Sequence, residues 1–255
     1  MINTVSIIGA GNVATVLGKT LFNNGIKIVN ICSRSLNRTE ELAVICRAKA
    51  ITRIDELDSD IDLLIVAVKD DAIQDVVSQV KMSVPIVHTS GSVGISVFRN
   101  VENHGILYPF QTFSSNRTIE ISEVPFFIEA STNEFEVILN EFVRVTMSKN
   151  VYNFDSASRA KIHLAGVLSN NFTTQLIIEA AYILDSINVP FTILKPLIEE
   201  TVKKIFDEGP EKALTGPAKR GDNMIIKKQL ASIENKKLQE IYRLMSELIM
   251  ESNVF

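Results

Sequence analysis

A group of polar residues in the carboxyl-terminal half of the chain has the side chains that proton transfer requires. His163 and Asn170 are seven residues apart and would share one face of a helix, with Asn171 at the edge of that face. An imidazole can exchange a proton with a substrate, and an amide can orient a carbonyl or imine group. Burying these groups without partners would cost about 1–3 kcal/mol each. Lys161 is a second candidate proton donor.

Two interpretations of this polar face stay open. In the first, His163, Asn171 and Lys161 are catalytic residues of a hydride-transfer site. In the second, they form a structural network that ties the helix to the rest of the chain. We assign no catalytic role to His88 or His104, because a single histidine beside a strand is more often structural.

The amino-terminal stretch has the composition of a phosphate-binding turn between a strand and a helix. Apolar residues 5–8 lead into a glycine-rich turn that ends at Ala14. The two glycines allow a tight turn and a close approach of a pyrophosphate, and the N–H groups at the helix start bind its oxygens. We expect these residues to contact a dinucleotide rather than to form only a structural turn: Gly9, Ala10, Gly11, Asn12 and Val13.

The residues that follow the second predicted strand favour NADP over NAD. An NAD site places a carboxylate about 20 residues beyond the glycines, but the first acid here is Glu40, inside a predicted helix. Ser33, Arg34 and Ser35 instead offer donors to a 2′-phosphate, and Arg38 adds a second cation. The alternative is that one serine caps the next helix beside a solvated arginine.

The sequence pattern of the elements that must position these groups predicts an α/β fold. Apolar runs near residues 5–8, 26–32, 51, 62–68, 85–88, 105–108, 124–129 and 151–154 predict strands, and helical patterns separate most of them. This alternation predicts a doubly wound, Rossmann-like sheet. Val68, Lys69 and Ser90 follow its strands, so we expect them to contact the cofactor, while Gln111 contacts cofactor or substrate. Asp70 or Asp71 is expected to cap the following helix.

From residue 155 onward the pattern is helical. Helices are predicted over about 156–187, 194–207, after 222 and over 236–251. We therefore predict an NADP-binding domain over 1–152 and an all-helical dimerisation and substrate domain over 153–255. The long first helix is apolar all round and is expected to be buried. In the loop 213–222, either Asp222 caps the next helix or Lys219 and Arg220 bind an anion.

Composition limits the classes of partner. The chain has 255 residues, 46% of them hydrophobic, with a net charge of −4 and no basic block, so nucleic acid is not expected as a partner. An apolar run of about 20 residues is lacking, and the first strand begins by Val5, which leaves no room for a signal peptide. Cys32 and Cys46 lack zinc-site spacing. We expect a cytoplasmic protein without a membrane segment or metal.

Several motifs together resemble one family. They are the glycine turn, His88-Thr-Ser-Gly-Ser92, Tyr108-Pro-Phe-Gln-Thr-Phe113, His163 with Asn171, Pro196-Leu-Ile198 and Leu214-Thr-Gly-Pro217. The family comprises NADP oxidoreductases with a Rossmann-like amino domain and a helical carboxyl domain of unknown function, like that of 6-phosphogluconate dehydrogenase. It is similar to pyrroline-5-carboxylate reductase and the deazaflavin-dependent NADP reductases. The resemblance implies NADP bound between the domains and a homodimer built through the helices.

The sequence therefore predicts an NADP-dependent oxidoreductase that acts on a small carbonyl or imine, or on the corresponding alcohol or amine, between the domains. The alternative is a non-catalytic NADP-binding or sensing protein. In the related hydroxyacid dehydrogenases, an asparagine follows the catalytic lysine by four residues. Ala165 stands four residues after Lys161, so His163 is the first choice as proton donor.

Overall fold

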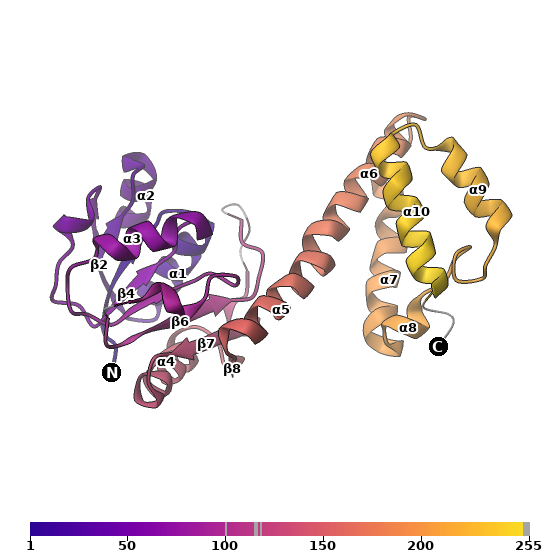
Figure 1. Cartoon of the computed structure of the whole chain (residues 1–255). Coiled ribbons are helices and arrows are strands. Elements are labelled where there is room, and N and C mark those ends of the chain that lie inside the picture. Colours follow the sequence, from indigo (N-terminus) through magenta and orange to yellow (C-terminus); the bar gives the residue numbers. More distant parts are fainter. Residues whose placement is uncertain (100, 115–116, 118, 252–255) are drawn as a thin grey trace. The chain divides into compact units, whose positions relative to one another are not determined.

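The chain forms two compact units in the computed structural model, which describes residues 1–99, 101–114, 117 and 119–251. The first unit is Met1–Ser169, and the second begins at Asn170 (Figure 1). All the strands among the described residues belong to the first unit, and the last of them ends at Asn153. The predicted domain boundary near residue 152 stays a prediction.

A single sheet forms the centre of the first unit. Within the described residues it has eight strands: β1 (Thr4–Ile8), β2 (Lys27–Cys32), β3 (Lys49–Ile51), β4 (Leu63–Val66), β5 (Ile86–His88), β6 (His104–Pro109), β7 (Phe126–Ala130) and β8 (Val151–Asn153). Their order is β3-β2-β1-β4-β5-β6-β7-β8. Only the β6–β7 pair among them is antiparallel. The first six strands follow the order of a doubly wound Rossmann sheet, which confirms the predicted fold class.

Helices cover both faces of this sheet. Alternate residues of β1 and β4 enter two different apolar clusters, as the two-residue period of a strand requires. One cluster includes residues of α1 (Asn12–Asn23), α2 (Leu36–Cys46) and α4 (Asn133–Thr146). The other includes residues of α3 (Ile73–Gln79). The central strands are therefore buried on both sides, which explains why they are almost wholly apolar.

The predicted long helix is interrupted. The structure has α5 (Ser156–Gly166), a π-helical segment over Val167–Phe172 and α6 (Thr173–Asp185). Asp155 caps α5 by accepting a hydrogen bond from the Ser158 N–H at 2.7 Å. The helix ends before Asn188, whose φ of 56° is left-handed. Single π-turns of this kind occur often at functional sites.

The second unit is helical, with α6, α7 (Lys195–Glu208), α8 (Pro210–Ala213), α9 (Asn223–Ser232) and α10 (Lys236–Glu251). Asp222 caps α9 by accepting a hydrogen bond from the Ile225 N–H at 3.3 Å, which confirms the capping alternative. The predicted burial of the long helix is wrong for the single chain. No residue of α6 is buried, and Tyr182 and Ile183 are 66% and 53% exposed, because one copy of this small unit does not cover its apolar surface.

None of the helices among the described residues combines the length and apolarity needed to cross a membrane.

Candidate active site

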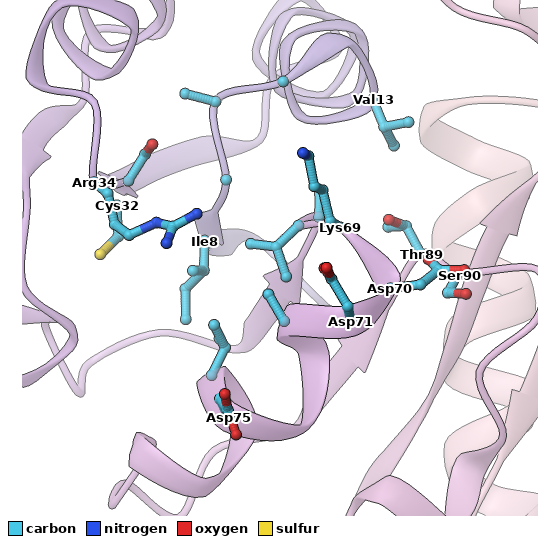
Figure 2. Close-up of a pocket in the computed structure, with 18 of the residues that line it drawn as sticks. Ile8, Val13, Cys32, Arg34, Lys69, Asp70, Asp71, Asp75, Thr89 and Ser90 are labelled. Atoms are coloured by element: carbon cyan, nitrogen blue, oxygen red, sulfur yellow. The ribbon is translucent and has the colours of Figure 1, made fainter.

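A long groove of about 1490 Å³ runs along the carboxyl edge of the sheet in the first unit (Figure 2). Its walls come mainly from the residues that follow β1 to β6, with further residues of α3 and with His163 on α5. Small-molecule pockets commonly measure about 300–1,000 Å³. The groove is therefore large enough for an extended ligand, at the place where doubly wound sheets bind nucleotides.

The glycine turn is built for close approach of a ligand. Gly9 has a φ of +130°, and a Cβ there would overlap the carbonyl oxygen of Ala67, which follows β4. A Cβ on Gly11 would instead meet no atom within 4 Å. Gly11 is exposed and precedes α1, whose first turn has no side-chain cap in the described structure. The open backbone N–H groups there fit a pyrophosphate.

Asn12 has a second role that the sequence did not suggest. Its Nδ2 donates a hydrogen bond to the carbonyl oxygen of Phe113 at 2.9 Å, so the side chain ties the glycine turn to the segment after β6. Any contact of Asn12 with a phosphate would then use its backbone N–H. Ala10 and Val13 line the same part of the groove.

The residues after β2 form a basic end of the groove. Arg34 and Arg38 are exposed, and no carboxylate among the described residues pairs with either. Ser35 occupies the N-cap position of α2 without a side-chain capping bond, and the Ser33 hydroxyl accepts a hydrogen bond from the Ser35 N–H at 3.3 Å. Because the arginines are unpaired and the Ser35 hydroxyl does not cap the helix, this end fits the 2′-phosphate of NADP.

Val68 and Lys69 follow β4 and line the groove, as predicted from the topology. Figure 2 shows the ammonium group of Lys69 in the groove between Arg34 and Val13. The aspartates beside it were predicted wrongly. Helix α3 begins at Ile73, so its N-cap position is Ala72, and neither aspartate caps it. Asp70 instead accepts a hydrogen bond from the Ser92 hydroxyl.

The turn after β5 is held by its own polar groups. The buried Ser90 hydroxyl accepts hydrogen bonds from the N–H groups of Ser92 and Val93 at 3.1 and 3.0 Å. His88 is fully buried, and its Nδ1 accepts a hydrogen bond from the Ser90 N–H at 3.2 Å. Its ring stacks on Phe98 with a centroid distance of 5.4 Å.

His88 is a neutral structural residue. Burial, followed by the nearby charge of Arg159, lowers the pKa of His88 from 6.5 to about 4. Because Nδ1 accepts a hydrogen bond, the neutral ring carries its proton on Nε2, which has no partner among the described atoms.

A tyrosine and a histidine meet at the other end of the groove. The Tyr108 hydroxyl at the end of β6 lies 3.0 Å from His163 Nδ1 on α5, and both residues line the groove. Burial, followed by the charge of Asp70, raises the pKa of Tyr108 to about 12. The phenol is therefore protonated at neutral pH, and the pair can hold and pass a proton.

The other catalytic candidates are placed differently. Lys161 is exposed and is not among the residues that line the groove. Asn171 is exposed and belongs to the second unit, so its place beside His163 stays a prediction. Gln111 lines the groove, whereas Tyr108 entered the sequence analysis only as part of a motif. Its position at the carboxyl end of a predicted strand was the signal that could have identified it.

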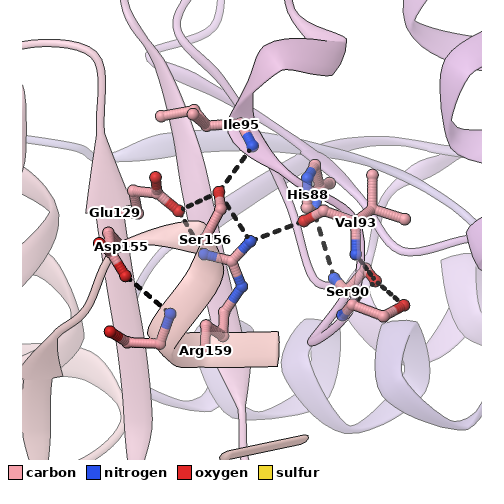
Figure 3. A network of polar contacts seen from close by, with 10 residues as sticks. His88, Ser90, Val93, Ile95, Glu129, Asp155, Ser156 and Arg159 are labelled. Carbon is pink, nitrogen blue, oxygen red and sulfur yellow. Dashed lines mark hydrogen bonds and ion pairs between the residues drawn. The ribbon is translucent and has the colours of Figure 1, made fainter. Parts of the chain in front are cut away.

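A buried network fixes the position of α5 (Figure 3). Arg159 is fully buried and forms an ion pair with Glu129 on β7. Its Nη2 also donates to the Val93 carbonyl at 2.6 Å. The Ser156 hydroxyl donates to Glu129 at 2.7 Å and accepts from the Ile95 N–H at 3.0 Å. Since Arg159 and His163 are four residues apart on α5, this network sets where the histidine lies.

Two family models match the chain. Residues 4–97 match the family described as "NADP oxidoreductase coenzyme F420-dependent", and residues 124–249 match a domain of unknown function, DUF2520. No curated protein matches the chain.

Solved structures match nearly the whole length. A protein from Bacteroides fragilis described as a "putative NADP oxidoreductase" is 37% identical, with a TM-score of 0.89 and 98% of both chains covered. Pyrroline-5-carboxylate reductase from Streptococcus pyogenes is 14% identical, with a TM-score of 0.63, covering 98% of this chain and 96% of that one. An imine reductase from Myxococcus stipitatus in complex with NADP⁺ is 14% identical, with a TM-score of 0.66 and coverage of 97% and 92%. The last two share the fold.

Proposed function

This chain belongs to the NADP oxidoreductases. We propose that it transfers a hydride between NADP(H) and a small carbonyl or imine compound, or the corresponding alcohol or amine. The cofactor of the family is NADP. The observation that carries the proposal is the Tyr108–His163 hydrogen bond in the same groove as the glycine turn and Arg34. When bound, NADPH supplies the hydride, and a paired phenol and imidazole can exchange the proton that the reaction also needs.

The residues of the groove fit NADP in distinct ways. The open space over Gly11 admits a pyrophosphate, and the N–H groups of the first turn of α1 bind it. Ser33, Arg34 and Ser35, with Arg38, hold the 2′-phosphate. Val68, Lys69 and Ser90 contact the cofactor beyond the pyrophosphate, as their place at the sheet edge predicts.

Arg34→Ala tests the cofactor site. A bidentate charged contact is worth about 1.5–3 kcal/mol, so NADP affinity by calorimetry should fall about 10- to 100-fold, while NAD affinity stays near that of the parent. Arg53→Ala is a matched control, because Arg53 also lines the groove but pairs with Asp55 and Glu56. Unchanged NADP affinity in Arg34→Ala would reject the phosphate clamp.

The chemistry is tested by a metabolite screen that follows NADPH absorbance. In this proposal His163 takes part in proton transfer, Asn171 orients the substrate, and Lys161 is the rival donor. His163→Ala should lower turnover by about 10²–10⁴ with little change in NADP affinity. Lys161→Ala is the comparison variant. A larger loss of turnover in Lys161→Ala than in His163→Ala would assign the proton-donating role to the lysine. A protein that only senses NADP would bind NADPH normally but would oxidise it with no compound in the screen.

The proposal includes a homodimer formed through the helices of the second unit. Large apolar side chains of that unit are exposed in the single chain, among them Leu197 at 65% and Phe206 at 84%. Large apolar side chains exposed on a single chain are commonly covered by a second subunit. The cytoplasmic location stays a prediction from the sequence, in keeping with the two free, buried cysteines.

A further inference from the structure

The tyrosine and histidine of the groove come from two elements that cannot easily shift. Tyr108 is the penultimate residue of β6, which pairs with β5 and β7, and its ring centroid lies 6.1 Å from that of Phe110 and 6.0 Å from that of Phe127. His163 is on α5, which Arg159 anchors through a buried ion pair. The 3.0 Å distance between the Tyr108 hydroxyl and His163 Nδ1 is thus set by the fold on both sides.

Gly91 shows how tightly this pair is enclosed. A Cβ on Gly91 would lie 2.6 Å from His163 Nδ1 and 2.6 Å from Tyr108 Cζ, although its φ is not in the left-handed region. The absence of a side chain, rather than an unusual backbone angle, is what the position requires. The backbone at Gly91 therefore packs against both rings where they meet.

We infer that the Tyr108 hydroxyl gives the proton to the substrate and that His163 stands behind it and restores that proton. This inference rests on the proposed function and assigns its proton-donating atom. The ring of His163 is half-buried, and its Nε2 has no partner among the described residues. Other polar groups nearby are engaged: Asp70 accepts from Ser92, and Ser90 accepts two N–H groups.

The step balances when His163 carries its proton on Nδ1. The Nδ1–H donates to the Tyr108 oxygen, which leaves the phenolic hydrogen free for the substrate. As a hydride reaches the carbon of a C=O or C=N bond, the π electron pair moves to the oxygen or nitrogen. That atom takes the phenolic proton, and the phenolate takes the proton of Nδ1 while Nε2 takes one from the solvent. The imidazole therefore stays neutral throughout, and one hydride and one proton are consumed in total.

Tyr108→Phe is the central test, because it removes one oxygen and keeps the ring contacts. We expect turnover to fall by about 10²–10⁴ with NADP⁺ affinity unchanged. Tyr152→Phe is the matched control, since Tyr152 also packs on Phe127, at 6.0 Å, but is half-exposed and does not line the groove. Turnover close to that of the parent in Tyr108→Phe, with His163→Ala still impaired, would overturn the inference and leave the proposed function standing.

The order of the two groups is tested by combining the variants. If they act in series, the double variant should be no slower than Tyr108→Phe alone. Added imidazole should restore part of the turnover of His163→Ala and none of that of Tyr108→Phe. Losses that multiply in the double variant would contradict the relay. If the parent oxidises NADPH with none of a panel of aldehydes, ketones and cyclic imines, the proposed function falls, and the role of Tyr108 with it.

A measurement without substrate is also decisive. The chain has three histidines, so the ¹⁵N resonances of labelled His163 can be assigned by comparison with His163→Ala. In the complete chain with NADP⁺, we expect the proton on Nδ1 and a clear change of that resonance in Tyr108→Phe. A ring protonated only on Nε2, or an unchanged resonance in Tyr108→Phe, would refute the arrangement.

Discussion

His88 should make the first unit sensitive to mild acid. Its pKa is lowered from 6.5 to about 4 by burial and then by the charge of Arg159, with the Gly94 backbone and then the charge of Asp70 acting in the opposite direction. Between these two pH values the unfolded chain binds a proton on this ring and the folded chain does not. The free energy of unfolding therefore falls as the pH drops. The loss is about 2 kcal/mol between pH 7 and pH 5 and about 3 kcal/mol near pH 4.

The assay is urea denaturation of the parent and of His88→Gln at pH 7 and pH 5, at one protein concentration. Whatever its stability at pH 7, the variant should not show the decrease of about 2 kcal/mol in the free energy of unfolding between these pH values. His104→Gln is the control, because His104 also packs on Phe98, at 5.3 Å, but is only half-buried. It should keep the pH dependence of the parent. If His88→Gln loses as much stability between pH 7 and pH 5 as the parent does, the buried neutral histidine is not the cause.

Other features of the structure give further predictions. Arg159→Met should lower the free energy of unfolding by about 3–5 kcal/mol, because it leaves the mostly buried Glu129 unpaired, while Arg53→Met at a solvent-exposed pair should change much less. Urea denaturation measures both changes, and an equal loss of free energy of unfolding in the two variants would refute this argument. Burial raises the pKa of Cys32 and of Cys46 to about 11, so both thiols should react slowly with Ellman's reagent until the chain is denatured. Light scattering at micromolar concentration should give twice 28.3 kDa, and a monomer would reject the dimer.

Short-range patterns were enough to predict the sheet. Most strands are local apolar runs, and the glycine turn and Arg34 lie next to strands whose order follows from alternation with helices. The helical half was harder. The apolar pattern of residues 156–187 predicts a helix, but it does not reveal what covers that helix. The structure leaves α6 exposed in the single chain, and it adds a π-helical segment that no periodicity indicated.

The errors at the site have a common cause, since each depends on contacts between distant residues. Asp70 looked like a helix cap because it follows a strand. A short 3₁₀ turn precedes α3, however, and the carboxylate of Asp70 accepts a hydrogen bond from Ser92, 22 residues away. The partner of His163 is Tyr108, 55 residues away. No local spacing rule connects such positions, so sequence could identify each residue as a candidate but not that the two side chains lie side by side.

The placement of this histidine shows why a buried ion pair is kept in the first unit. Buried ion pairs add little stability compared with apolar residues of the same shape. Arg159, however, joins three elements at once: its own helix α5, Glu129 on β7, and the Val93 carbonyl in the segment after β5, 66 residues away. An apolar side chain could fill the same space, but it could not fix the rotation of α5 relative to the turn that contains Gly91. The backbone at Gly91 packs against both rings, so a small rotation of α5 would change the contact between Tyr108 and His163. The directional bonds of Arg159 therefore serve the geometry of the Tyr108–His163 pair more than the stability of the fold.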